Sequence, residues 1–255
     1  MTKKLGVYDS GMGGFSLVKE ILKDPFVSEI YYYSDYERLP YGNLTTQELE
    51  ARGVEICEYL LNQNVDAILL ACNTATVNTI NYMRQKFSVP FVGVEPYINA
   101  IKKEDSLANK NMIGLIVTPA TAKSDRVNWL KGNFDQDDRV TIIASENLAR
   151  SIEHYIRGEK EKRAIIESEL SELKQMGFDG LILGCTHYPL VMSLFDEILD
   201  IPIIDPSPFV IQQLRKVLGQ ENTLRESCTN PIISFSENLK SGWSEMDKEQ
   251  IKQMI

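Results

Sequence analysis

The chain has 255 residues, of which 43% are hydrophobic and 25% charged, and this suits one large globular domain or two of about 100–150 residues. A net charge of −9 argues against nucleic acid or an anionic membrane as a partner. No apolar run approaches the roughly 18 residues that span a bilayer, and the N-terminus lacks the apolar segment of a signal peptide, so we expect a cytoplasmic protein.

Short apolar runs between turn residues predict strands, and helical patterns fill the gaps between them. The predicted strands are 4–9, 29–34, 67–71, 91–94, 113–117, 140–144, 180–184, 201–204 and 232–236. The predicted helices are about 14–23, 46–62, 74–87, 97–103, 121–130, 147–156, 160–176, 190–199, 207–218 and 246–254. Strands that alternate with helices predict βαβ units and parallel sheets, hence the α/β class.

Two cysteines stand in nearly matching segments. Residues 66–76 read DAILLACNTAT, and residues 179–189 read DGLILGCTHYP. In each segment an Asp opens a buried strand, and a Cys follows where that strand ends. Ligands bind at the carboxyl ends of strands in open α/β sheets, so both thiols stand where chemistry is expected.

The chain also repeats itself on a larger scale, because residues 5–10 resemble residues 113–118 and a cysteine segment follows each. A chance match between ordinary βα units is the alternative. We expect two similar doubly wound parallel-sheet domains that face each other with pseudo-two-fold symmetry. Crossings near 95–97 and 205–208 make residues 1–96 with 207–255 the first domain and 97–206 the second, with the active site in the cleft between them.

A glycine-rich loop, DSGMGG at residues 9–14, joins the first strand to the first helix. Its glycines allow close backbone approach, and its amides would face an anion at the helix N-terminus. It matches no nucleotide-binding pattern. A plain tight turn is the alternative.

The remaining reactive residues divide into structural and functional candidates. Cytoplasmic cysteines are expected to be reduced, and these lack the spacing of a zinc site, so no metal is expected. Cys57 and Cys228 have the setting of small buried hydrophobes. Cys72 and Cys185 each precede a helix start, which favours a thiolate. His187, two residues beyond Cys185, is the candidate proton partner.

Taken together, these motifs resemble the glutamate racemase family. The matches are residues 9–14, 40–42 (PYG), 71–75 (ACNTA) and 183–190 (LGCTHYPL), with weaker matches at 93–96 and 118–124. They follow the family's order and cover most of the chain to about residue 208. The resemblance implies an isomerase that interconverts L- and D-glutamate without a cofactor, supplies D-glutamate for peptidoglycan, and is usually a homodimer.

Position by position, the resemblance also implies residue roles. Cys72 and Cys185 match the catalytic cysteines, Asp9 the acid beside the first, His187 the partner of the second, and Glu153 the second acid. The substrate-binding positions are Ser10, Pro40, Tyr41, Gly42, Asn73, Thr74, Thr118, Thr121 and Thr186.

The chain departs from the family pattern in several places, including Val117, where Gly is usual, and Val127, near which a Tyr is missing. Residues 145–150, SENLAR, replace an apolar run with Pro, so an exposed helical Glu is the alternative for Glu153. Tyr36 and Glu37 stand where small residues are usual. Lys123, the lysine near a motif, is expected to face solvent.

Two thiols on opposite faces of one carbon suit racemisation, since one removes the Cα proton and the other returns it. Two other hypotheses stay open. One is an aspartate racemase, or another member of the superfamily that acts on a related small acid. The other is a non-catalytic paralogue that binds a small acid in the cleft. No apparent pyridoxal-phosphate or Schiff-base lysine motif accompanies the cysteines.

Overall fold

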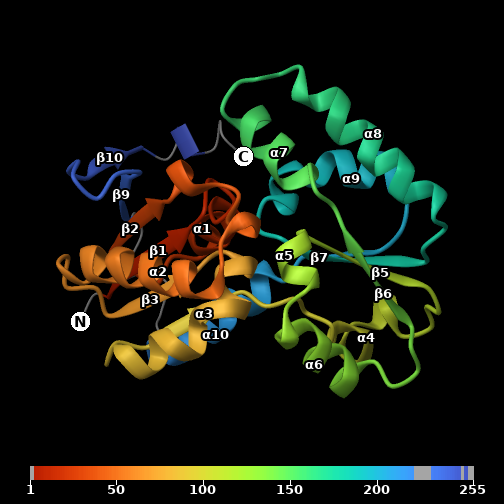
Figure 1. Ribbon diagram of the computed structural model, residues 1–255, viewed down its shortest axis with the longest axis horizontal. Helices are drawn as coiled ribbons and strands as arrows, with labels where there is room; N and C mark the ends of the chain where they lie inside the picture. The colour runs from red at the N-terminus through yellow and green to blue at the C-terminus, as the bar shows by residue number, and fades with distance from the viewer. Residues whose placement is uncertain (1–2, 221–230, 248–249, 252–255) are drawn as a thin grey trace.

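The computed structural model describes residues 3–220, 231–247 and 250–251, and it contains two sheets (Figure 1). The first has the order β10-β9-β2-β1-β3-β4 and the second β6-β5-β7-β8. The first comprises β1 (Lys4–Asp9), β2 (Glu29–Ser34), β3 (Ala67–Leu70), β4 (Phe91–Gly93), β9 (Ile232–Ser236) and β10 (Ser244–Met246). The second comprises β5 (Ile113–Val117), β6 (Val140–Ala144), β7 (Gly180–Gly184) and β8 (Ile203–Ile204).

Helices cover both faces of the sheets, so the predicted α/β class with two facing parallel-sheet halves is confirmed (Figure 1). They are α1 (Phe15–Lys23), α2 (Thr46–Leu61), α3 (Asn73–Lys86), α4 (Ala100–Lys103), α5 (Pro119–Ala122), α6 (Asp125–Phe134), α7 (Leu148–Ile156), α8 (Lys162–Gln175), α9 (Met192–Leu199) and α10 (Ser207–Val217). Short 3₁₀ turns η1 (Tyr36–Arg38), η2 (Tyr41–Asn43), η3 (Asp105–Leu107) and η4 (Tyr188–Val191) complete the description.

Three expectations about elements need comment. The single helix predicted over 121–130 is wrong, because the side chains of Thr118 and Ser124 cap two successive helices, α5 and α6. Strand β10 was not predicted, and it runs antiparallel to β9. The helix predicted over 246–254 is wrong at Met246, which ends β10; most of the rest, like Cys228, lies outside the described residues.

The two halves share a detail that explains why an Asp opens each cysteine segment. Asp66 accepts a hydrogen bond from the backbone N–H of Lys4 at 2.8 Å, at the start of β1. Asp179 accepts the N–H of Met112 at 3.1 Å, just before β5. Each Asp therefore ties its strand to the central neighbour in its own sheet, which favours a true internal repeat.

One apolar core runs through both halves and holds them together. It joins residues of β1 and α1 to residues of β7, α7 and α9. After β8 the chain returns to the first half, where α10 packs against α1 and β4 (Figure 1). Among the described residues, no helix combines the length and the apolar character that crossing a membrane requires.

A buried ion pair anchors the loop that leads from β2 to the site. Arg52 on α2 donates from Nε to Asp35 at 3.0 Å, and the Asp35 side chain has no exposed surface. Asp35 also accepts the hydroxyl of Tyr41 at 2.7 Å. Because these contacts satisfy a fully buried carboxylate, removing the cation leaves a charge with too few partners.

We therefore predict that Arg52→Met lowers the free energy of unfolding by about 3–5 kcal/mol. Arg163→Met, which breaks the exposed pair with Glu167, should change it by less than about 1 kcal/mol. Urea unfolding followed by circular dichroism measures both. Equal midpoints for the two variants would contradict the larger contribution to the free energy of unfolding that we assign to the buried pair.

Candidate active site

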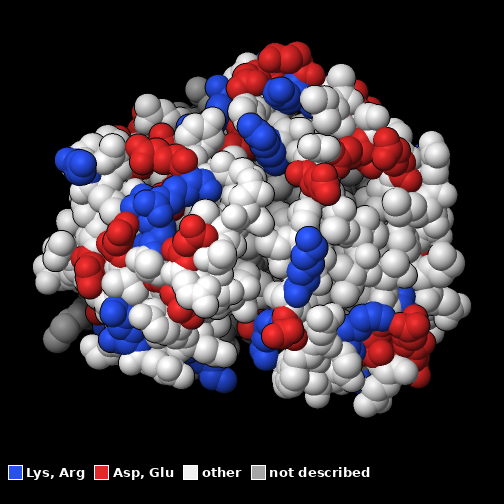
Figure 2. Space-filling model, in the orientation of Figure 1, with Lys and Arg blue, Asp and Glu red and all other residues white. Residues whose placement is uncertain are grey.

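A cavity of about 430 Å³ lies where the two halves meet, at the carboxyl ends of β1, β3, β5 and β7. Cys72 and Cys185 both line it, one from each half. Figure 2 shows the hollow between the halves, with basic side chains over α5 and α7 beside it. The two sulfurs thus face one space large enough for a small amino acid.

On the first side, Cys72 is the N-cap residue of α3 and is almost fully buried. Its Sγ lies 3.5 Å from the Ser10 hydroxyl, which in turn donates to Asp9 Oδ1 at 3.2 Å. Burial raises the pKa of the Cys72 thiol to about 12, and the nearby Asp9 carboxyl adds to the rise. Asp9 therefore reaches this thiol through Ser10 rather than directly.

Asp9 ends β1 without any exposed surface. Its carboxylate accepts the backbone N–H groups of Ser10 and Gly14, and the Thr186 hydroxyl donates to it across the cleft at 3.4 Å. Burial raises the pKa of Asp9 to about 6, although the charge of His187 opposes the rise. This carboxyl group therefore changes protonation near neutral pH.

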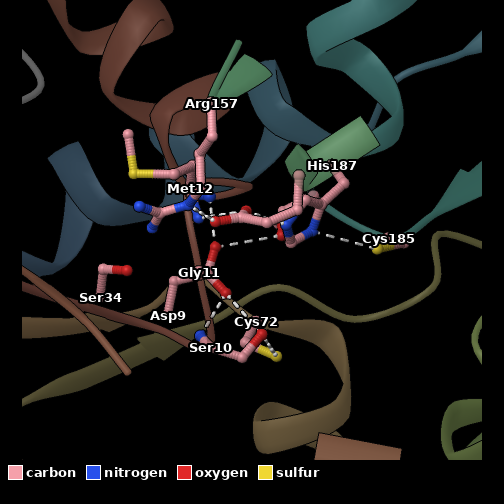
Figure 3. A network of polar contacts seen from close by, with 12 residues as sticks. Asp9, Ser10, Gly11, Met12, Ser34, Cys72, Arg157, Cys185 and His187 are labelled. Carbon is pink, nitrogen blue, oxygen red and sulfur yellow. Dashed lines mark hydrogen bonds and ion pairs between the residues drawn. The ribbon is translucent and has the colours of Figure 1, made fainter. Parts of the chain in front are cut away.

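On the second side, Cys185 follows β7 and is backed by an imidazole and a carboxylate (Figure 3). Its Sγ lies 3.7 Å from His187 Nδ1, and His187 Nε2 lies 2.7 Å from Glu153 Oε2. Burial alone would lower the pKa of His187, but the hydrogen bonds and charges of Cys185 and Glu153 hold it well above its ordinary value. An imidazolium favours negative charge on the neighbouring sulfur.

Glu153 lies on α7 with no exposed surface, so the alternative of an exposed helical residue is wrong. Besides His187, its carboxylate accepts the N–H of Met12 at 2.8 Å and Nε of Arg157 at 2.6 Å. Burial would raise the pKa of Glu153, but these partners, His187 foremost, bring it to about 2. Glu153 is therefore an ionised, fixed acceptor behind His187.

The loop of residues 9–14 comes unusually close to the second side. A Cβ at Gly11 would lie 2.7 Å from Glu153 Oε2, and one at Gly13 would lie 2.5 Å from His187 Nδ1. The expectation that the loop amides face a ligand anion needs correction, because amides of this loop bind the protein's own Asp9 and Glu153 carboxylates. Glycine is required here for contact between the halves.

Most predicted substrate-binding positions border the cavity. Those on its wall are Ser10, Pro40, Tyr41, Gly42, Asn73, Thr74, Thr118 and Thr186. Thr121 lies behind the wall, where its hydroxyl is 3.1 Å from that of Thr74. Both polar atoms of the buried Asn73 side chain lack a partner among the described residues, so this amide is free for a ligand.

Several cavity residues had no sequence-based role. They are Leu39, Asn43, Pro119, Lys123, Ser145, Glu146, Asn147, Ala149 and Arg150. Lys123, expected to face solvent, is exposed but lies on the cavity wall, and neither it nor Arg150 forms an ion pair with a described residue. Five residues of this set lie in segment 145–150. The departure from the family pattern in that segment was the signal that could have identified them.

The arrangement can move protons at one carbon from two sides. Each sulfur has a carboxylate behind it, through a hydroxyl on one side and an imidazole on the other. Among the described residues, no group of three or more His, Cys, Asp or Glu side chains is arranged to hold a metal ion. Acid–base chemistry by thiols is thus what this site is equipped to perform.

Comparisons with known proteins identify the family. A family model described as Asp/Glu/Hydantoin racemase matches residues 26–214. The glutamate racemase of Clostridium botulinum (strain Alaska E43 / Type E3) is 30% identical over 254 residues, covering 98% of this chain and 97% of that protein.

Solved structures of glutamate racemases share the fold. An isoform from Bacillus anthracis has a TM-score of 0.75 at 29% identity, covering 91% of this chain and 87% of that one. The Francisella tularensis enzyme, in complex with D-glutamate, has a TM-score of 0.71 at 28% identity, covering 92% and 87%. This chain therefore belongs to the Asp/Glu/hydantoin racemase family, among its glutamate racemases, and is an isomerase of the amino acid racemase type.

Proposed function

We propose that this protein interconverts L-glutamate and D-glutamate by proton transfer at Cα between Cys72 and Cys185, without a cofactor. The observation that carries the proposal is that both thiols line one small cavity from opposite halves. Glutamate is the chosen substrate because the relatives named above are glutamate racemases and one of them was solved with D-glutamate bound.

In this mechanism the two sides begin in different protonation states. The buried Cys72 thiol holds its proton, consistent with its raised pKa of about 12. His187, protonated and held by Glu153, favours the thiolate of Cys185. Cys185 then removes the Cα proton of one enantiomer while Cys72 supplies a proton to the other face. The roles reverse for the opposite enantiomer, as microscopic reversibility requires.

Polar groups on the wall would hold the α-carboxylate, where negative charge develops as the proton leaves. The Asn73 amide is the strongest candidate because it is buried without a partner among the described residues and Asn73 lines the cavity. Preorganised donors of this kind act in a low-dielectric site, where they stabilise the carbanion-like transition state strongly. Ser10, Thr74 and Thr186 add hydroxyls to the same wall.

The wider context is also a proposal. We assign residues 1–96 with 207–255 to one domain and 97–206 to the other, supported by the membership of the two sheets. We expect a cytoplasmic homodimer whose D-glutamate is used in peptidoglycan synthesis, in keeping with the family.

The first prediction concerns the two thiols. Cys72→Ser and Cys185→Ser should each lower kcat for racemisation by about 10²–10⁴-fold, because each removes one of the two acid–base groups. Circular dichroism of glutamate solutions follows the turnover. Cys57→Ser is the matched control, since Cys57 is buried away from the cavity. Near wild-type turnover in either cavity variant would end the two-thiol proposal.

The second prediction concerns pH. Asp9 has a pKa of about 6, whereas Glu153 stays ionised and His187 protonated around neutrality. For the enantiomer whose Cα proton Cys72 removes, we expect kcat/KM to fall as the pH drops through about 6, because protonated Asp9 can no longer accept a proton from the Ser10–Cys72 side. Asp9→Asn should be slower and should lack this acid limb. An unchanged limb in Asp9→Asn would assign the titration to another group.

The third prediction concerns the two unpaired cations on the cavity wall. They offset locally the repulsion that a chain of net charge −9 exerts on an anionic substrate. Arg150→Gln should therefore raise the KM for glutamate by about 2–10-fold, less at high salt, with little change in kcat. Lys174→Gln, an exposed change on α8 away from the cavity, should leave KM unchanged. Equal KM values for both variants would contradict a role for Arg150.

A further inference from the structure

The polar chain behind Cys185 continues beyond Glu153 to the surface (Figure 3). Arg157 donates from Nε to Glu153 Oε1 at 2.6 Å and from Nη2 to Glu237. Its guanidinium lies 3.8 Å from the centre of the Tyr36 ring. Arg157 is thus held by three side chains, one on its own helix and two from the first half.

Two of these partners lie where the family resemblance gives no guidance. Tyr36 replaces a small residue of the family pattern, and it packs against Arg157 rather than lining the cavity. Glu237 follows β9, beyond the residues 26–214 that match the family model. Ser34 donates to Glu237 at 3.1 Å and fixes it at the end of β2.

Charges alternate along this chain of contacts. Outward from Cys185, the groups are the His187 imidazolium, the Glu153 carboxylate, the Arg157 guanidinium and the Glu237 carboxylate. Glu153 has no exposed surface, so its ionised form depends on cations and donors within the protein. Arg157 holds one carboxylate oxygen while Met12 and His187 hold the other, so the group cannot rotate.

We propose that Arg157 is a positioning residue for the Cys185 side of the site, and that Glu237, directly after β9, holds Arg157 in place. Arg157 is not among the residues that line the cavity. It fixes Glu153, which orients His187, which in turn keeps its Nδ1 directed at Cys185. The inference deepens the proposed racemase function and rests on it.

Other titratable groups also face this chain of contacts, and a test must leave them unchanged. Asp9 and Tyr32 of the first half act on Glu153 electrostatically. Cys72 interacts with Cys185 across the cavity, and Tyr188 lies beside Cys185. Substitutions at Arg157 and Glu237 leave all of these groups in place.

The test measures the rate of iodoacetamide alkylation at Cys185 as a function of pH, with Cys72 in the same molecule as reference. Peptide mass spectrometry reads the two sites separately. Arg157→Gln should move the Cys185 midpoint to higher pH by about half a unit or more, since a cation that favours the thiolate is lost. The Cys72 profile should not move. In Arg157→Lys, which keeps the positive charge, the Cys185 midpoint should stay close to the wild-type value.

Glu237→Gln separates electrostatics from loss of structure. It removes a negative charge from the same network, so the Cys185 midpoint should stay or move to lower pH, opposite to Arg157→Gln. A purely structural role predicts that both variants move the midpoint upward together. Since Glu237 is partly exposed, this variant also keeps the test available if Arg157→Gln folds poorly.

Kinetics supply a second readout. Arg157→Gln should lower kcat about tenfold with KM within about twofold, because the residue acts on a reacting group and not on substrate binding. Arg163→Gln, which removes an exposed cation on α8, should change neither.

The outcomes are distinct. An unshifted Cys185 profile in Arg157→Gln, or an upward shift in Glu237→Gln, overturns the positioning role. Alkylation needs no turnover, so it tests the positioning role independently of activity. If the predicted shifts appear in a protein that does not racemise glutamate, the positioning role of Arg157 stands and the proposed function is rejected.

Discussion

The structure depends on one close contact between the two halves. The loop between β1 and α1 packs against Glu153 on α7 and against His187, just before η4. Met12 donates its backbone N–H to Glu153. The space beside Gly11 and Gly13 is too small for a Cβ, because Glu153 and His187 fill it. The same loop contains Asp9 and Ser10, which back Cys72. A single backbone segment therefore sets the geometry of both sides, and each half completes the site of the other.

The two sides are related by the fold but not by chemistry. Cys72 is backed by a hydroxyl and a carboxyl group of raised pKa, and Cys185 by an imidazolium and a carboxylate of lowered pKa. Burial is common to both, so the difference comes from the partners. The asymmetry gives each sulfur its own partner for exchanging a proton, a hydroxyl and a carboxyl group for Cys72 and an imidazole for Cys185.

Much of this could be predicted from the sequence because it is local. Strands β1, β2, β5, β6, β7 and β9 match their predicted bounds, and both cysteines stand where those patterns put them. What was missed depends on caps or long-range contacts: the break before Ser124 and the edge strand β10. Lys123 is exposed as expected, but its place on the cavity wall was not predicted. Glu153 was named from a resemblance alone. Its burial between Met12, His187 and Arg157 joins segments far apart in the chain, which periodicity does not report.

The most direct test of two bases on opposite faces is racemisation of L-glutamate in heavy water with purified protein and no added cofactor. At early times, proton NMR with chiral separation compares solvent deuterium at Cα in the D product and in the remaining L substrate. Two thiols predict a product that is almost fully deuterated while the substrate pool keeps its hydrogen. Deuterium appearing in the substrate as fast as in the product, or no inversion at all, would contradict the account.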